Sequence, residues 1–255
     1  MSFQAEKALV LKHYEALAGA EPSCAATTLA KHTAPHWRFR GVHPIHEKVG
    51  AKAVAATFWS PFLAAFSKVQ RRQDIFVAGL NEIDGFKGRW VLSMGHLMGL
   101  FDAPFLGIPP TRRIAMLRYA EFNKVEHGAI TETAFFCDLL HLMAQAGLKP
   151  LPHETGAHLV QPGPATHDGL LFKDAPADEG HDTLTLINRM IFDINHHKRF
   201  GTPHQELAHT WHEDMVWWGP AGIGSTYTID RYIEQHQGPF RRHIKDRRYN
   251  GHVCR

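Results

Sequence analysis

The stretch IAMLRYAEFNKVEHGAITETAFF, residues 114–136, decides the fold. Both of its ends are rich in the β-branched and aromatic residues that strands favour. Between them, the EHG triplet at 126–128 is typical of a tight hairpin turn. The stretch therefore predicts two neighbouring antiparallel strands, over 114–123 and 130–136.

The segments around this hairpin have helix-like and strand-like patterns. Apolar residues at helical spacing predict three helices, over 4–19, 23–32 and 50–65. Alternating patterns predict three strands, over 36–41, 73–77 and 89–97. After the hairpin, a Leu-rich run predicts a short helix over 139–146, which Gly147 ends.

This order of elements predicts an α+β domain over residues 1–147, with helices packed on one face of a curved antiparallel sheet. Residues 148–181 hold five prolines and no periodic pattern, so we expect a linker that runs along the surface of the first domain. Helical patterns return over 183–192 and 205–210. We therefore expect a second, partial domain over residues 182–255.

The second domain repeats features of the first at a constant spacing of 178 residues. The identities are Leu29-Ala30 with Leu207-Ala208, Gly41 with Gly219, and Pro61-Phe62 with Pro239-Phe240. We interpret them as a tandem repeat, and the alternative is unrelated segments that match by chance. In this repeat Arg255 corresponds to residue 77, so the second copy stops before its long strands.

The composition excludes several classes of protein. With 44% hydrophobic residues, 16 Phe and 6 Trp in 255 residues, the chain has too many apolar anchors to be disordered. No run approaches the roughly 18 apolar residues of a membrane-spanning helix. The net charge is only +3 and the basic residues are scattered, which argues against nucleic acid as a partner. Three separated cysteines and an N-terminus without a secretion signal predict a cytoplasmic protein.

Five motifs follow one another in the first domain: GLF at 99–101, GIPPTRR at 107–113, GAITE at 128–132, DLL at 138–140 and AQAG at 144–147. In this order they resemble the SnoaL-like polyketide cyclase (ester cyclase) family of the nuclear-transport-factor-2-like superfamily. The resemblance covers residues 5–147 completely and 183–255 in part. It implies a cone-shaped cavity closed by helices over a curved sheet, and aldol-type ring closure of polyketide esters with neither metal nor cofactor.

Three positions depart from the pattern of this family. Arg112 replaces a turn glycine, and Ala134 stands where a Trp often precedes the Asp. The family's strand histidine falls on Phe101, so His96 is a neighbour of that position and not its counterpart.

The first candidate for catalysis is Asp138. Aldol-type ring closure needs a base that takes a carbon-bound proton and an acid that protonates the new alkoxide. One carboxyl group can do both if apolar walls raise its pKa. Phe135, Phe136 and Leu139 next to Asp138 favour such a pocket. The alternative is that Asp138 caps the helix that follows it, which would lower its pKa.

The second candidate is His96, which lies between Met94 and Met98 in an apolar strand. As a catalytic residue it would hydrogen-bond a substrate carbonyl or share protons with Asp138. The alternative is a core histidine whose ring nitrogens are satisfied by the backbone.

Other residues are expected to contact the substrate, with the two arginines holding an ester or enolate oxygen. The alternative for the aromatic residues is ordinary core packing, and for the arginines a solvated surface. The expected substrate-binding residues are Trp37, Phe39, His43, Trp59, Met98, Phe101, Arg113, Arg118 and Tyr119.

The 20 histidines raise the question of a metal site. One group is His32, His36, His43 and His46, and another is His204, His209 and His212. Zinc needs three or four converging ligands, and Pro35 and Pro44 interrupt the first group, so we expect no metal.

The sequence therefore favours a cyclase-type enzyme acting on a small apolar carbonyl compound, without a cofactor. Two alternatives stay open: an isomerase or hydratase in the same cavity, and a non-catalytic small-molecule binding protein. Expected partners are a small-molecule substrate and, through the sheet, a homodimer or an intrachain pseudo-dimer, with neither nucleic acid nor membrane.

Overall fold

The computed structural model describes residues 2–244, which form two compact units. Unit 1 consists of residues 2–150 and 162–174, and unit 2 of residues 151–161 and 175–244. The stretch 148–181, expected as a linker, is thus divided between the two units, and its last residues are helical from Ala177 onward. Part of the second domain expected over 182–255 lies outside the described residues.

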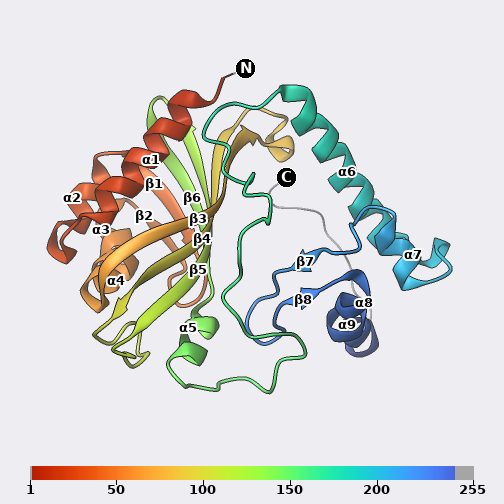
Figure 1. The fold of residues 1–255 in the computed structure, drawn as a ribbon. Helices are drawn as coiled ribbons and strands as arrows, with labels where there is room; N and C mark the ends of the chain where they lie inside the picture. Colours follow the sequence, from red (N-terminus) through yellow and green to blue (C-terminus); the bar gives the residue numbers. More distant parts are fainter. Residues whose placement is uncertain (1, 245–255) are drawn as a thin grey trace. The chain divides into compact units, whose positions relative to one another are not determined.

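A six-stranded curved sheet forms the centre of unit 1 (Figure 1), in the order β2-β1-β6-β5-β4-β3. β1 pairs with β6 in parallel, and the other neighbours are antiparallel. The strands are β1 (Thr33–Gly41), β2 (Glu47–Val49), β3 (Phe66–Leu80), β4 (Arg89–Phe101), β5 (Ile114–Glu126) and β6 (Ala129–Cys137). The predicted hairpin at 114–136 is therefore present as β5 and β6, joined by the turn at His127 and Gly128.

The helices of unit 1 come mostly before the long strands, and α1 to α4 lie on one face of the sheet (Figure 1). A single-turn π segment, η2, joins α3 to α4, so the helix predicted over 50–65 is continuous but irregular. The elements are α1 (Gln4–Ala18), η1 (Pro22–Cys24), α2 (Ala25–Ala30), α3 (Ala51–Val54), η2 (Ala55–Trp59), α4 (Ser60–Ala65), η3 (Glu82–Asp84) and α5 (Leu139–Gln145).

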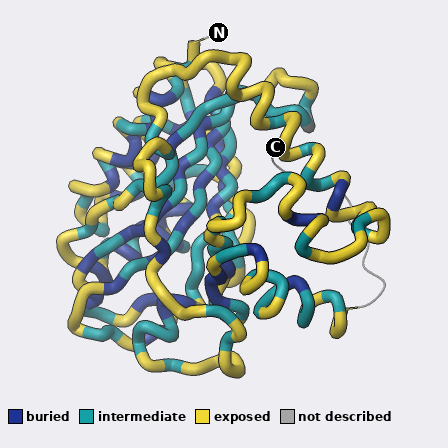
Figure 2. The backbone as a smooth tube through the Cα atoms, turned by 45° about the vertical axis from the view of Figure 1, so that its right-hand side comes forward, coloured by how far each residue is buried: buried dark blue, intermediate teal, exposed yellow. Residues whose placement is uncertain are grey.

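Side chains alternate along β4 and β5, and this alternation defines two faces of the sheet. The inner face, covered by α1 to α4, carries buried residues such as Leu97, Phe101 and Leu117. The neighbouring residues along each strand point to the opposite face, which we call the outer face and which carries His96, Met98 and Arg118. Figure 2 shows the buried residues concentrated along this sheet.

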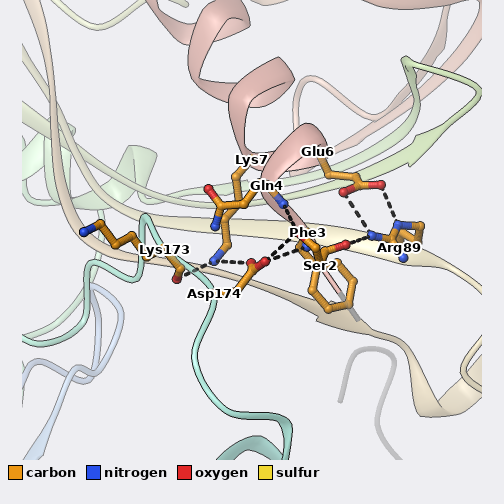
Figure 3. Close-up of polar contacts among 8 residues, drawn as sticks. All are labelled: Ser2, Phe3, Gln4, Glu6, Lys7, Arg89, Lys173 and Asp174. Carbon is orange, nitrogen blue, oxygen red and sulfur yellow. Dashed lines mark hydrogen bonds and ion pairs between the residues drawn. The ribbon is translucent and has the colours of Figure 1, made fainter.

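Residues 162–174 run along the free edge of the sheet as a strap. Phe76 of β3 donates its N–H to Gly169 and accepts from Leu171. The strap ends at Asp174, whose carboxylate accepts from Ser2 Oγ at 2.7 Å and lies 3.3 Å from Lys7 Nζ (Figure 3). The strap therefore covers an edge strand that would otherwise expose unpaired backbone groups, and it anchors the start of α1.

Unit 2 holds four α-helices, two short helical segments and a two-stranded antiparallel sheet among its described residues. The elements are α6 (Ala177–Asn195), η4 (His197–Arg199), α7 (Pro203–Ala208), β7 (Val216–Trp217), β8 (Thr226–Tyr227), α8 (Ile229–Tyr232), η5 (Ile233–Gln237) and α9 (Gly238–His243). None of the helices within residues 2–244 combines the length and apolar character needed to cross a bilayer.

The helices and strands of unit 2 match those in the first half of unit 1 at a constant sequence spacing of 178 residues. The bounds of α7, α8, η5 and α9 equal those of α2, α3, η2 and α4 plus 178. The strand register is also the same, since Arg38 pairs with Val49 and Val216 pairs with Tyr227. The spacing read from a few identities in sequence thus recurs in the secondary structure.

The predicted fold class, an α+β curved sheet with packed helices, is confirmed. The strands are longer than predicted, and β3 begins at Phe66, seven residues before the predicted start. The helix predicted over 23–32 is shorter, because Ser23 lies in the turn η1 and α2 begins at Ala25 without a side-chain cap.

Candidate functional site

The outer face of the sheet brings together four ionisable side chains, which we call the outer cluster: His96, Arg118, Asp138 and His141. His96 on β4 stands opposite Arg118 on β5. Asp138, directly after β6, donates its backbone N–H to the carbonyl of Arg118 at 3.0 Å. Three consecutive strands therefore place an imidazole, a guanidinium and a carboxylate next to one another.

His96 is a buried, neutral imidazole. Its exposed fraction is 4%, and burial lowers its pKa to about 4, with electrostatic interactions with His141 and Arg118 acting in the same direction. Its Nδ1 lies 3.6 Å from Oδ2 of Asp74, whose own pKa is raised by burial. Its Nε2 has no hydrogen-bond partner within residues 2–244. A neutral imidazole with an open ring nitrogen can donate or accept one further hydrogen bond.

A β-bulge places Asp74 beside His96. The pairing of β3 with β4 shifts between Gln73 and Ile75, which leaves Asp74 without a partner residue on β4. Opposite the bulge, Gly95 has a φ of 157°, and a Cβ there would lie 2.0 Å from the carbonyl oxygen of Arg72. Only glycine fits this close approach of two backbones.

Asp138 caps α5, as the alternative interpretation of its sequence position predicted. Its Oδ1 accepts the backbone N–H of His141 at 2.9 Å. The residue is half-buried. The capping bond engages Oδ1.

Gln145 holds α5 against β5. Its side-chain amide donates to the carbonyl of Met116 at 2.8 Å and accepts the Met116 N–H at 2.9 Å. The same Nε2 lies 3.1 Å from Nδ1 of His141. An amide N–H facing Nδ1 makes that nitrogen the acceptor, so the ring proton of neutral His141 lies on Nε2.

Arg118 supplies the positive charge of the outer cluster. Burial lowers the pKa of its guanidinium, and the carboxylate of Asp138 acts in the opposite direction. Such a group stays charged at neutral pH, since the ordinary pKa of arginine is above 12. It can therefore stabilise negative charge that develops on a bound oxygen.

A second group, the inner polar network, lies on the opposite face beneath α1. Its centre is an ion pair between Arg71 Nη1 and Glu121 Oε2 at 2.9 Å, with side-chain exposures of 8% and 3%. The guanidinium carbon lies 3.7 Å from the centre of the Tyr14 ring and 4.5 Å from that of Tyr119. Burial raises the pKa of both phenols, so both stay protonated.

Hydrogen bonds extend this network across the sheet. Asn123 donates to Tyr14 Oη at 3.0 Å and accepts from Thr133 Oγ1 at 2.7 Å, and Trp37 Nε1 donates to that same Thr133 oxygen at 2.9 Å. Tyr119 Oη lies 2.8 Å from Ser93 Oγ. The inner polar network is thus almost fully satisfied, apart from Arg71 Nη2, which has no partner among the described residues.

The structure divides the predicted site residues between the two faces. The predicted catalytic residues Asp138 and His96 lie on the outer face with Met98 and Arg118. The predicted aromatic walls pack in the core of the inner face, each at most 3% exposed: Trp37, Phe39, Trp59, Phe101 and Tyr119. His43 and Arg113 are exposed. The predicted residues therefore do not line one common cavity.

Sequence reasoning did not single out Arg71 or Glu121. The pattern of β5 held a signal for the glutamate, because Ala115, Leu117 and Tyr119 place Glu121 on the apolar face of the strand at period two. The sequence has no comparable signal for Arg71, which lies among the charged residues of β3.

The histidine groups do not form a metal site in the described part of the chain. There, no three His, Cys, Asp or Glu side chains are arranged to hold a metal ion. His43 Nδ1 lies 3.2 Å from His46 Nε2, which is a hydrogen bond between two exposed rings.

Comparisons with known proteins show a likeness of fold. No family model matches the chain, and no curated protein matches it. The structure is similar to a candidate SnoaL-like polyketide cyclase from Jannaschia sp. CCS1, at 19% identity and a TM-score of 0.45, over 58% of this chain and 95% of that one. It is similar to IdmH, a candidate polyketide cyclase from Streptomyces antibioticus, at 20% identity and a TM-score of 0.44, over 55% and 96%.

A third similar structure is an NTF2-like protein from Burkholderia thailandensis E264, at 18% identity and a TM-score of 0.40, over 56% of this chain and 97% of that one. SnoaL-like and NTF2-like proteins, the group that the motifs resemble, are among the structures to which this one is similar. Identities this low do not transfer an activity.

Proposed function

We propose that unit 1 is an acid–base enzyme that transfers protons on a small carbonyl compound, as in aldol-type ring closure. The observation that carries this proposal is the convergence of His96, Arg118 and Asp138 on three neighbouring strands. Proton transfer next to a carbonyl group needs a base, a cation and a neutral hydrogen-bonding group at one place.

Each residue has a separate role in the proposed reaction. The carboxylate of Asp138 takes a proton from the carbon next to the substrate carbonyl, and Arg118 stabilises the enolate oxygen that results. The enolate carbon then attacks a second carbonyl, which forms a carbon–carbon bond and an alkoxide. Asp138 returns its proton to the alkoxide, and Nε2 of His96 contacts a substrate oxygen. No oxidant, reductant or cofactor enters this balance.

A second candidate function, a non-catalytic small-molecule binding protein, is favoured by the cap at Asp138. Its hydrogen bond to His141 N–H gives the carboxylate a structural role that needs no reaction. The two functions are separable, because Asn is as good an N-cap as Asp but has no basic oxygen.

The experiment compares Asp138→Asn with Asp138→Ala. Exchange of the α-protons of small aromatic β-keto esters into deuterated water, followed by NMR, measures the proton transfer. We expect both variants to lose about 10²-fold or more in rate. Only the alanine variant should lose stability, by about 1 kcal/mol. An asparagine variant that exchanges at the wild-type rate, or a wild type without activity on the esters, would support the binding protein instead.

A further inference from the structure

A hollow of about 540 Å³ opens in unit 1 at some distance from the outer cluster. It lies between α1, the beginning of β4 and the turn that joins β5 to β6. Its apolar lining includes Ala8 and Leu9 of α1 and Val125 of β5, which is 6% exposed. A volume of this size is in the range of small-molecule sites.

The two carboxylates that line the hollow already have cationic partners. Glu6 is bound by Arg89, with Nε 2.5 Å from Oε1 and Nη2 3.1 Å from Oε2 (Figure 3). Glu126 lies 2.9 Å from Lys124 Nζ and accepts from Thr131 Oγ1 at 2.7 Å. These hydrogen bonds lower the pKa of both carboxyl groups, so both stay ionised and paired.

The remaining charges of the lining are positive. Lys12 on α1 and Lys87 before β4 are exposed, and neither has a carboxylate within 4 Å in the described part of the chain. Asp84 accepts the backbone N–H groups of Lys87 and Gly88, and it offsets part of this charge from beside the hollow. The hollow therefore has an apolar floor and two unpaired ammonium groups at its rim.

We propose that this hollow binds a small organic anion, a carboxylate on an apolar frame. The ammonium groups of Lys12 and Lys87 hold the carboxylate, and the side chains of Ala8, Leu9 and Val125 contact the apolar frame. Cations at the rim of a hollow with low-dielectric walls make the binding of an anion more favourable. Burial of the apolar frame away from water contributes further to the free energy of binding.

This site is separate from the proposed reaction site. Along β5, Val125 lies seven residues after Arg118, and seven residues of extended strand span about 24 Å. The inference therefore stands whether or not the outer cluster is catalytic, and it is tested by binding alone.

The experiment titrates the full chain with benzoate and follows the backbone amide signals by NMR. We expect saturable shifts at Leu9 and Val125, and weaker binding as salt is added, because exposed charges are screened. The double variant Lys12→Ala/Lys87→Ala should weaken binding at least tenfold, and Lys12→Arg/Lys87→Arg should retain it. The matched control, Lys31→Ala/Lys52→Ala, removes two exposed lysines outside the hollow and should bind as the wild type does.

Two further probes test the chemistry of the ligand. Benzyl alcohol lacks the charge and inorganic phosphate lacks the apolar frame, so both should bind at least tenfold more weakly than benzoate. Benzyl alcohol binding as tightly as benzoate would overturn the role of the lysines, and phosphate binding as tightly would overturn the role of the apolar floor. Benzoate binding that is absent, or unchanged in Lys12→Ala/Lys87→Ala, would overturn the site itself.

Discussion

Arg71 and Glu121 form a buried ion pair, and each partner depends on the other. Because both side chains are nearly inaccessible to water, the loss of one charge leaves the other buried and unpaired. Although burial opposes the charged form, Glu121 raises the pKa of Arg71 above its ordinary value. Arg71 therefore stays charged and does not become neutral by losing its proton. The pair is therefore a structural constraint on the inner face.

We expect Glu121→Gln to lower the free energy of unfolding by about 3–5 kcal/mol. The double variant Arg71→Met/Glu121→Leu should cost much less, because it leaves no buried charge. Urea unfolding measures both. As a control, Glu47→Gln breaks the exposed pair with Arg38 and should cost less than about 1 kcal/mol. Equal losses in Glu121→Gln and Glu47→Gln would contradict this account.

His13 makes unit 1 sensitive to acid. The ring is 1% exposed, and burial, with a further contribution from Arg71, lowers its pKa to about 3. An unfolded histidine has a pKa near 6.5, so between these values the unfolded chain binds a proton that the folded chain does not. Stability is therefore lost as the pH falls below about 6.5, and His96, with its pKa of about 4, acts in the same direction.

The free energy of unfolding should fall below pH 6.5 by up to about 1.4 kcal/mol per pH unit for each of these histidines. Urea unfolding at a series of pH values measures this slope. In His13→Leu the slope between pH 6 and pH 4 should be shallower, because one of the two groups no longer titrates. The same slope in both proteins would show that His13 does not contribute.

At the scale of elements, the 178-residue spacing, which we interpret as a tandem repeat, was visible in sequence only as a few identities. In the structure it extends to helix bounds and strand register, including residues that are not identical. Backbone geometry is retained where side chains differ, because many sequences satisfy one pattern of helix starts and turns. For example, Gly50 and Thr228 precede the matching helices α3 and α8, both with positive φ.

The element bounds that the sequence did not predict have physical causes. β3 exceeds its predicted length because it is a sheet-edge strand whose early residues, such as Arg72, are charged and exposed, which hides the strand pattern. The parallel pairing of β1 with β6 joins segments about ninety residues apart and leaves no local mark in the sequence. Local patterns report local structure, whereas long-range pairing depends on the whole sheet.

His204 links α7 to α8 in unit 2 and makes this link dependent on pH. Its Nδ1 lies 2.7 Å from Asp230 and its Nε2 3.0 Å from Glu213, so both ring nitrogens face carboxylates. These hydrogen bonds, first that of Asp230 and then that of Glu213, raise the pKa of His204. A raised pKa means that the link is fully present below about pH 6.5 and is lost as the pH rises through the higher folded value.

NMR titration of the His204 ring should therefore give a midpoint above 6.5. The double variant Glu213→Gln/Asp230→Asn removes both negative charges and should bring the midpoint back toward the ordinary value. A wild-type midpoint at or below 6.5 would contradict the link.

At the scale of the whole molecule, the sequence predicted the architecture of unit 1 better than the arrangement of its site. Asp138, His96, Met98 and Arg118 were expected near one another, and the sheet brings them together. The expectation of a single cavity with aromatic walls did not take into account that successive residues of a strand point to opposite faces of the sheet. Tyr119 follows Arg118 by one residue and therefore points to the opposite face.

Other predictions concern the assembly of the protein and its location in the cell. Pairing through the sheet, as a homodimer or an intrachain pseudo-dimer, stays a prediction, as does the cytoplasmic location. The outer face retains exposed apolar side chains such as Ile114 and Phe136, at 64% and 52%.

The central claim is that Arg118 and Asp138 act on the same reacting group. A double-mutant cycle measures this directly, with Arg118→Met, Asp138→Asn and their combination assayed by α-proton exchange of a β-keto ester. Because residues that act as a unit are not additive, we expect the double variant to be no slower than the slower single variant. Rate losses that multiply, or full activity in Asp138→Asn, would contradict the claim.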